Sequence, residues 1–203
     1  MEYFFLGCDF IMITSKSDYI KYLKMDKMAR NEKKSHPRLF VDEVWKFQRL
    51  LRKVEYVNNC NSKILKPYLL LLKLRLHKQG LKLGFSISVN SFGPGLYIAH
   101  YGTLVVNRNV KVGENCKIHV GVNIGAWGQS DDAPKIGDNV YIGPGAKIFG
   151  KIKVGNNVSI GANAVVNKDV PDNCVLVGVP ARIVKLNGRP INVSLTDYWK
   201  DRK

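Results

Sequence analysis

The sequence predicts a mainly β protein, in which a parallel β-helix of hexapeptide repeats follows an α-helical N-terminal domain. Two observations lead to this fold class. An aliphatic residue recurs every six positions from residue 106 to residue 166, with one interruption, whereas residues 15–83 carry apolar side chains at helical spacing. We expect the helical domain over residues 1–84, the β-helix over 85–187 and a C-terminal tail over 188–203.

The N-terminal domain is expected to contain three basic helices. Ser15, with Asp18 three residues later, is typical of a helix N-cap and predicts a helix over residues 16–34. Apolar residues at helical spacing predict a second helix over 38–58, and a third helix is expected over 63–79. Met12 offers an alternative start, in which case residues 1–11 lie outside the working protein.

The six-residue period matches neither an α-helix nor the two-residue alternation of hairpin strands. It fits a coil with three flat faces, in which each hexad forms one strand and one corner. The aliphatic residue of each hexad should point inward, and Gly or Asn at the corners permits backbone angles closed to other residues. The inward series is Val106, Val112, Ile118, Ile124, Ile136, Ile142, Ile148, Val154, Ile160 and Val166.

The repeat skips a hexad at residue 130. Residues 126–134 (AWGQSDDAP) are polar and turn-prone, so we expect a loop that leaves the coil there. Loops on a rigid scaffold commonly carry binding residues.

Composition narrows the functional classes. With 45% hydrophobic and 24% charged residues, the chain is expected to fold as a globular protein rather than to be disordered. The net charge of +16 favours polyanionic partners, namely nucleic acid, anionic lipid, acidic polysaccharide or a phosphorylated cofactor. No nucleic-acid-binding motif accompanies the lysines, so we expect no nucleic-acid partner.

The cysteines and the apolar runs exclude further classes. Cys8, Cys60, Cys116 and Cys174 show no CxxC or zinc-site spacing, so we expect reduced structural thiols and no metal site. The apolar run at residues 69–72 is far shorter than the ~20 residues that span a bilayer. We therefore expect a cytoplasmic protein, with peripheral contact at the inner face of the membrane left open.

Three stretches carry a family resemblance: GPGLYIAHYGTLVVN (93–107), IGDNVYIGPGAKIFG (136–150) and IGANAVVNKDVPDNCVLVGVPARIV (160–184). They resemble the serine acetyltransferase-like branch of the hexapeptide-repeat acyltransferases. The resemblance implies a left-handed parallel β-helix that transfers an acetyl group from acetyl-CoA to a hydroxyl. It also implies a homotrimer, or a dimer of trimers, with active sites in the grooves between neighbouring coils.

His100, in the stretch AHYGT, matches the general base of that family. An unperturbed imidazole titrates near pH ~6.5, so its neutral form can accept a hydroxyl proton at physiological pH. Counting back in sixes from Val106 places residue 100 at an inward phase, but Gly102 allows a change of register. His119 follows the inward Ile118 and should face outward, where it either orients the substrate or is simply solvated.

The resemblance also implies where acetyl-CoA binds. Small residues would contact the pantetheine through their backbone, and basic residues near the C-terminal coils would meet the phosphates. Each basic residue is alternatively an exposed solubilising charge. The matching positions are Gly145, Ala146, Ala162, Lys168, Arg182 and Lys185. In the loop, Trp127 could stack on a sugar or on adenine, or serve packing alone.

The acceptor is inferred from departures from the family pattern. Serine-specific members carry an Asp where this chain has Ala99, a second Asp at Phe85, and a His at Ala133. Asp131 and Asp132 in the loop could orient the imidazole instead, or be solvated.

These losses lead us to expect an O-acetyltransferase of polysaccharide (capsule or exopolysaccharide) biosynthesis that acetylates a sugar hydroxyl. The stretch FVDEVWKFQRLLRKVEY (40–56) also resembles members of that kind. The alternatives are a serine O-acetyltransferase of cysteine biosynthesis and a non-catalytic β-helix scaffold.

Overall fold

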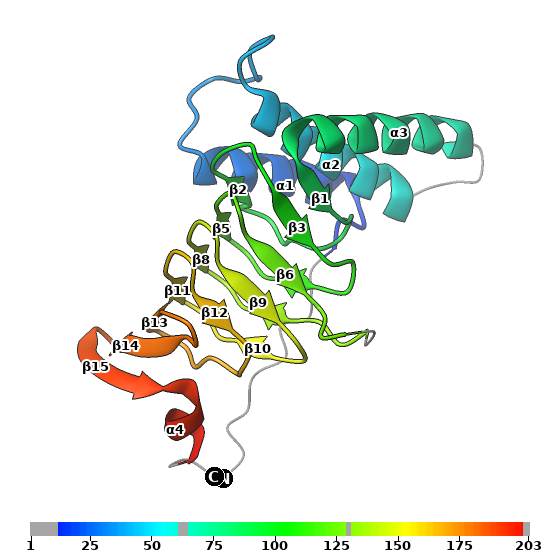
Figure 1. The fold of residues 1–203 in the computed structure, drawn as a ribbon. Helices are drawn as coiled ribbons and strands as arrows, with labels where there is room; N and C mark the ends of the chain where they lie inside the picture. The colour runs from blue at the N-terminus through cyan, green and yellow to red at the C-terminus, as the bar shows by residue number, and fades with distance from the viewer. Residues whose placement is uncertain (1–11, 61–64, 129–130, 201–203) are drawn as a thin grey trace.

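The computed structural model describes residues 12–60, 65–128 and 131–200. Three helices, α1 (Lys16–Ala29), α2 (Glu43–Asn59) and α3 (Lys66–Leu83), lie across one end of a parallel β-helix (Figure 1). Residues 1–11, which a start at Met12 would leave out, lie outside the described residues.

All three expected helices form, with ends that differ from the sequence prediction for local reasons. Ser15 caps α1 by accepting a hydrogen bond from the backbone N–H of Asp18 at 3.0 Å. The helix stops five residues early, before Asn31, whose φ of 52° is incompatible with an α-helix. Helix α2 starts late because Phe40 has a φ of 66°. Helix α3 extends to Leu83, where Gly84 in the left-handed conformation ends it.

The β-helix has the three parallel faces that the hexad period predicts. The first sheet contains β1 (Phe85–Ile87), β3 (Leu104–Val106), β6 (Asn123–Gly125), β9 (Lys147–Phe149) and β12 (Val165–Val166). The second contains β4 (Lys111–Val112), β7 (Lys135–Ile136) and β10 (Lys153–Val154). The third contains β2 (Tyr97–Ile98), β5 (Lys117–Ile118), β8 (Tyr141–Ile142), β11 (Ser159–Ile160), β13 (Cys174–Val177), β14 (Arg182–Leu186) and β15 (Arg189–Ser194).

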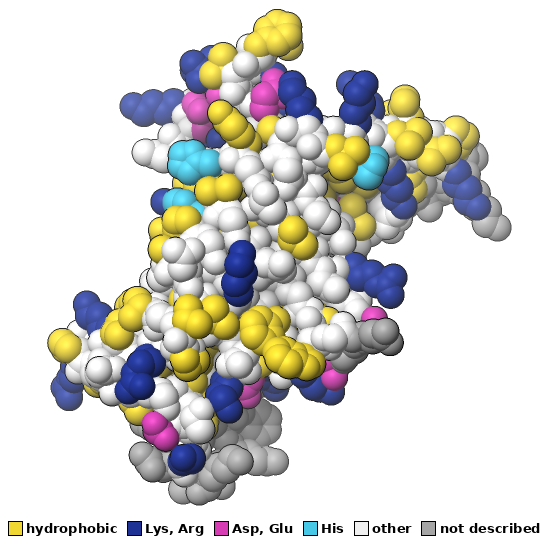
Figure 2. Space-filling model, in the orientation of Figure 1, with side chains coloured by type: hydrophobic (Ala, Val, Ile, Leu, Met, Phe, Trp, Pro, Cys, Tyr) yellow, Lys and Arg dark blue, Asp and Glu magenta, His cyan; other side chains and the backbone are white. Residues whose placement is uncertain are grey.

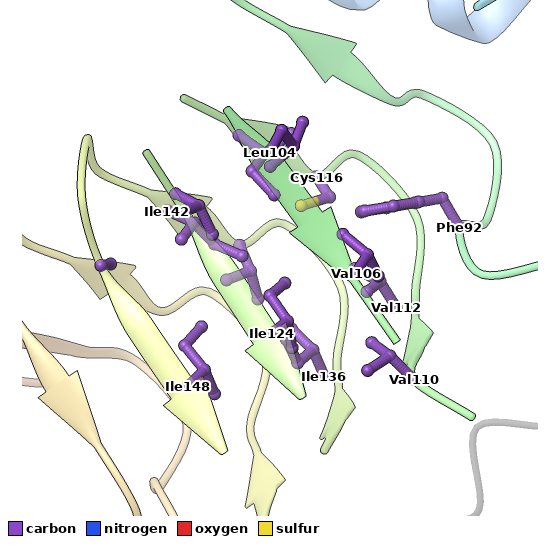
Figure 3. Packing of buried hydrophobic residues seen from close by; sticks show 14 of the residues in the cluster. Phe92, Leu104, Val106, Val110, Val112, Cys116, Ile124, Ile136, Ile142 and Ile148 are labelled. Carbon is purple, nitrogen blue, oxygen red and sulfur yellow. The ribbon is translucent and has the colours of Figure 1, made fainter. Parts of the chain in front are cut away.

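The predicted inward series fills the interior of the coil. None of its ten side chains is more than 4% exposed, and Figure 3 shows several of them stacked on successive coils. Phe92 closes this core near the helical end. Cys116 belongs to the same core, and burial raises the pKa of its thiol to about 12, so it serves as a small apolar side chain there.

Asparagines form a ladder at the corner that leads into the third sheet. Each has a φ of 55–56°, and each side-chain amide except the last donates to the amide oxygen of the next, at 2.9–3.1 Å. The ladder consists of Asn115, Asn139, Asn157 and Asn173. Asparagine tolerates the left-handed conformation better than most residues, so it suits a corner that repeats in every coil.

A fully buried arginine fixes the helices to the first coil. The guanidinium of Arg52 in α2 pairs with Asp26 of α1 at 2.9 Å and with Glu55 at 3.0 Å. It also donates to the carbonyl oxygens of Phe92 and Gly93 at 2.8 and 2.7 Å. Burial lowers the pKa of Arg52, but the two carboxylates raise it more, so the arginine stays charged.

The C-terminal segment, expected as a tail over 188–203, forms regular structure over residues 189–200. The strands β13, β14 and β15 pair antiparallel and extend the third sheet, and α4 (Leu195–Lys200) follows. Leu195 is buried, and Trp199 Nε1 donates to the carbonyl oxygen of Asp169 at 2.7 Å. This segment therefore covers the end of the coil opposite to the helices (Figure 1).

Candidate active site

His100 lies in an enlarged corner between β2 and β3. The inward residues Ile98 and Val106 are eight positions apart, whereas successive inward residues in regular hexads are six apart. The two additional residues move His100 out of the inward phase, and its side chain is exposed. Gly102, with a φ of 133°, provides the change of backbone direction that the corner needs.

His119 lies beside His100 on the next coil. The ring centroids are 6.1 Å apart, and the ring planes are inclined by 51°. The strand register places His119 next to Ala99, whose small side chain leaves space for the imidazole. His119 Nε2 is buried and forms no hydrogen bond with any group in the described part of the chain, and its ring packs edge-on against Tyr141 at 5.3 Å.

Lys117 sets the charge around these histidines. Its Nζ lies 5.1 Å from the ring centroid of Tyr97 and 5.8 Å from that of Tyr141. Burial lowers the pKa of His119, and the positive charge of Lys117 lowers it further, so the neutral imidazole is favoured. We call these five side chains, His100, His119, Lys117, Tyr97 and Tyr141, the histidine–tyrosine cluster.

Lys117 and the tyrosines were missed by the sequence analysis. Each directly precedes an inward isoleucine of the third sheet, and all three pair in one register. The hexad phase alone could have found Lys117 and Tyr141 as outward neighbours. Tyr97 could not be found in this way, because the enlarged corner breaks the hexad phase between Tyr97 and the regular repeats that begin at Val106.

The expected cofactor residues divide between two edges of the coil. Gly145, Ala162 and Arg182 lie along the edge between the third and first sheets, below His100. The side chain of Ala146 is completely buried in the core, which leaves only its backbone for a ligand. Lys168 follows β12 and therefore lies at the corner between the first and second sheets.

The two basic residues of β14 are exposed. Arg182 Nε donates to Asn192 Oδ1 at 2.9 Å. Lys185 pairs in register with Val175 in the middle of the third sheet. Both remain accessible to a phosphate group.

Residues 126–128 and 131–134 leave the coil between β6 and β7, where the interrupted repeat predicts a loop. Residues 129 and 130 of that predicted loop lie outside the described residues. Trp127 is 67% exposed, and its ring centroid lies 5.2 Å from that of Phe149. A cavity of about 470 Å³ opens beside it, with polar residues among those that line it: Ser86, Ser88, Asn107, Arg108 and Asn123.

The loop carboxylates have partners of their own. Asp131 accepts a hydrogen bond from Asn109 at 3.0 Å and lies 3.7 Å from Arg108, while Asp132 pairs with Lys151 at 3.2 Å. No carboxylate in the described ranges forms an ion pair or hydrogen bond with His100. Within one protomer, the loop therefore does not supply the orienting carboxylate that the sequence suggested.

Two other positions at which this chain departs from the family pattern, Phe85 and Ala133, pack against apolar side chains. Phe85 is buried and packs edge-on against Phe47 of α2, with 5.1 Å between ring centroids. Ala133 packs against the hydrophobic core. As for metals, the described residues contain no group of three or more His, Cys, Asp or Glu side chains that could hold an ion.

Comparison with known proteins identifies the family that this chain resembles. Residues 133–168 match the family model for the bacterial transferase hexapeptide (six repeats). The serine acetyltransferase of Staphylococcus epidermidis is 44% identical over 101 residues, which cover 49% of this chain and 47% of that protein. The chain spans less than half the length of the first relatives it matches.

Solved structures match a larger part of the chain. Serine acetyltransferase from Brucella abortus in complex with coenzyme A is 31% identical, with a TM-score of 0.66 over 85% of this chain and 70% of that one. Serine acetyltransferase from Neisseria gonorrhoeae in complex with serine is 28% identical, with a TM-score of 0.67 over 84% and 71%. The repeat and these neighbours support the expected left-handed sense of the coil.

These findings contradict the expected sugar acceptor in polysaccharide biosynthesis, because the relatives and structural neighbours are serine acetyltransferases. The expectation relied on missing family residues and on the resemblance of residues 40–56, and neither observation identifies an acceptor. A charged partner for an amino acid can come from another position, such as Lys117. The chain belongs to the bacterial hexapeptide-repeat transferases.

Proposed function

We propose that this protein is an acetyl-CoA-dependent serine O-acetyltransferase with His100 as its general base. The observation that carries the proposal is the enlarged corner, which presents His100 to solvent beside the half-buried His119. Of the acceptors considered from the sequence, we prefer serine, because the relatives and structural neighbours are serine acetyltransferases.

The chemistry requires one base and no redox partner. The neutral imidazole of His100 takes the proton of the serine hydroxyl as its oxygen attacks the thioester carbonyl of acetyl-CoA. The carbon–sulfur bond then breaks, and the thiolate of CoA takes a proton back from the imidazolium. The products are O-acetylserine and free CoA, so atoms and charges balance.

Lys117 supplies a cation for the carboxylate of serine. Its Nζ lies over the tyrosine rings of the cluster, and its positive charge acts on His119, so it is close to that imidazole. An ammonium–carboxylate contact is charge-assisted and stronger than a neutral hydrogen bond. This contact offsets the loss of the charged family residues at Ala99 and Phe85.

The proposed acetyl-CoA site follows the edge that carries His100. Gly145 and Ala162 offer a surface without large side chains, and Arg182 at the C-terminal end offers a cation for a phosphate. Lys168, Trp127 and the loop lie at another corner of the coil. This division is what a homotrimer would need, because a groove between protomers brings different edges of two coils together.

Release of free thiol from acetyl-CoA tests the proposal. We expect turnover with L-serine and at least about tenfold lower kcat/KM with L-serinamide, which lacks the carboxylate. Lys117→Gln should remove most of this preference, whereas Lys135→Gln, on the second sheet, should preserve it. Turnover of serine and serinamide at equal rates would contradict the role of Lys117. No turnover and no binding of acetyl-CoA would favour the scaffold alternative.

A further inference from the structure

Helix α3 has apolar side chains on two opposite faces. Leu72, Leu76 and Leu83 are buried against the rest of the molecule. Leu70 and Leu74 are 60% and 57% exposed, and Leu81 is 70% exposed. Positions 70, 74 and 81 follow the i, i+4, i+11 spacing of one helix face, so these leucines form a stripe that faces away from the core. We call this set the leucine stripe.

Positive charges flank the leucine stripe on both sides. At 100° per residue, two lysines fall on one side of the stripe and three basic residues on the other. The helix contains no acidic residue, and none of its basic side chains forms an ion pair with any described residue. The flanking residues are Lys66 and Lys73 on one side, and Arg75, Lys78 and Lys82 on the other.

A second apolar element lies at the same end of the molecule. The segment of Leu39, Phe40 and Val41 connects α1 and α2, and its side chains are 73%, 86% and 59% exposed. Lys46 Nζ lies 6.0 Å from the ring centroid of Phe40. Figure 1 shows this connection and α3 at the end of the molecule opposite to β15, and Figure 2 shows hydrophobic and basic side chains together there.

We propose that α3 docks this protein on an anionic membrane surface, lying in the interface with the leucine stripe towards the lipid. An apolar stripe between two rows of basic residues fits such a surface, because acyl chains cover the leucines while anionic headgroups meet the lysines. Covering the stripe with α3 of a second copy would bring ten basic side chains together without a compensating carboxylate from either helix. Charge complementarity therefore favours lipid.

Docking of this kind is peripheral. Among the helices of the described residues, none combines the length and the apolar character needed to cross a bilayer. The charged rows of α3 would keep the helix at headgroup depth. The inference concerns the outward face of α3 and does not rest on the proposed function.

Flotation with vesicles tests the inference on the full chain. We expect the protein to float with vesicles of 70% phosphatidylcholine and 30% phosphatidylglycerol, and at least about tenfold less with pure phosphatidylcholine. Raising the salt concentration from about 50 mM to about 500 mM should weaken the binding, because salt screens the headgroup attraction.

Two variants separate the stripe from the charges. The triple variant Leu70→Gln, Leu74→Gln, Leu81→Gln and the double variant Lys73→Glu, Lys78→Glu should each bind anionic vesicles at least about tenfold more weakly. The matched control Ile20→Gln, Met28→Gln replaces exposed apolar residues of α1 and should bind like the wild type. Circular dichroism of every variant verifies folding.

Two outcomes would overturn the inference. The first is an absence of binding to anionic vesicles at low salt, or equal binding by the wild type and the triple glutamine variant. The second is a wild-type assembly that light scattering shows to be larger than that of the triple variant, which would assign the stripe to contacts between copies of this chain.

Discussion

At the scale of single residues, burial and a neighbouring charge give His119 a lower pKa than that of an ordinary surface histidine. Its ring is packed against Tyr141, and Lys117 adds a positive charge nearby, so the pKa of His119 is lowered. The folded-state pKa then lies below the unfolded one. Any stability that this residue contributes is present above the unfolded pKa and is lost as the pH falls through the folded pKa.

Lys117→Gln should raise the pKa of His119, because it removes a positive charge that disfavours the imidazolium. An NMR titration of the histidine ring protons measures the change. Lys135→Gln, an exposed lysine on another sheet, serves as the control and should leave the pKa of His119 unchanged. An equal pKa of His119 in wild type and Lys117→Gln would show that Lys117 does not act on this imidazole.

Arg52 is the residue on which attachment of the helices most depends. Arg52→Met should lower the free energy of unfolding by about 3–5 kcal/mol, because it leaves the buried carboxylates of Asp26 and Glu55 without their counter-charge. Urea denaturation measures the loss. Lys53→Met, on the same helix, should change the stability by less than about 0.5 kcal/mol. Similar losses for both variants would refute the role of the buried network.

At the scale of elements, the corners of the coil are specified by residues that accept a positive φ. Asn139→Ala removes two rungs of the ladder and places a Cβ-bearing side chain without a local hydrogen bond at a φ of 55°. We expect a loss of about 1–3 kcal/mol. Asn139→Gly should cost less, because glycine adopts this φ without strain. Thermal unfolding compares the two, and a glycine variant less stable than the alanine variant would contradict this explanation.

The regular part of the coil could be predicted because a repeat places every inward side chain by the same rule. The hexad series predicted the interior from Val106 to Val166, and the polar break predicted that the chain leaves the coil between β6 and β7. The enlarged corner could not be predicted, because the repeat does not extend across it. The strands β14 and β15 were missed for a similar reason, since they pair antiparallel and follow no hexad.

The buried ion-pair network of Arg52 and the histidine–tyrosine cluster depend on contacts between segments that are distant in the sequence. Arg52 is one basic residue among many in a basic helix, and only the folded chain brings it against Asp26 and the first coil. The helix period predicted the second helix, whose Val44, Phe47 and Leu51 lie in the core, but it could not identify a buried charge. In the same way, no local pattern joins His100 to His119.

At the scale of the whole molecule, the β-helix presents residues in rows along its edges. The row below His100 ends near Arg182, and the helices close the opposite end of the coil. The error about the acceptor also belongs to this scale. Missing family residues were taken to mean another substrate, although Lys117, on the neighbouring coil, offers a charge that linear comparison overlooks.

The kcat for acetyl transfer to serine by His100→Ala tests the central claim most directly. We predict that kcat falls by about 10²–10⁴-fold, because the general base is lost. The dissociation constant for acetyl-CoA should stay within about twofold of the wild type, since no contact with the cofactor is assigned to His100. His36→Ala, at an exposed position outside the coil, should retain full activity. A His100→Ala variant that keeps the wild-type kcat would contradict the account.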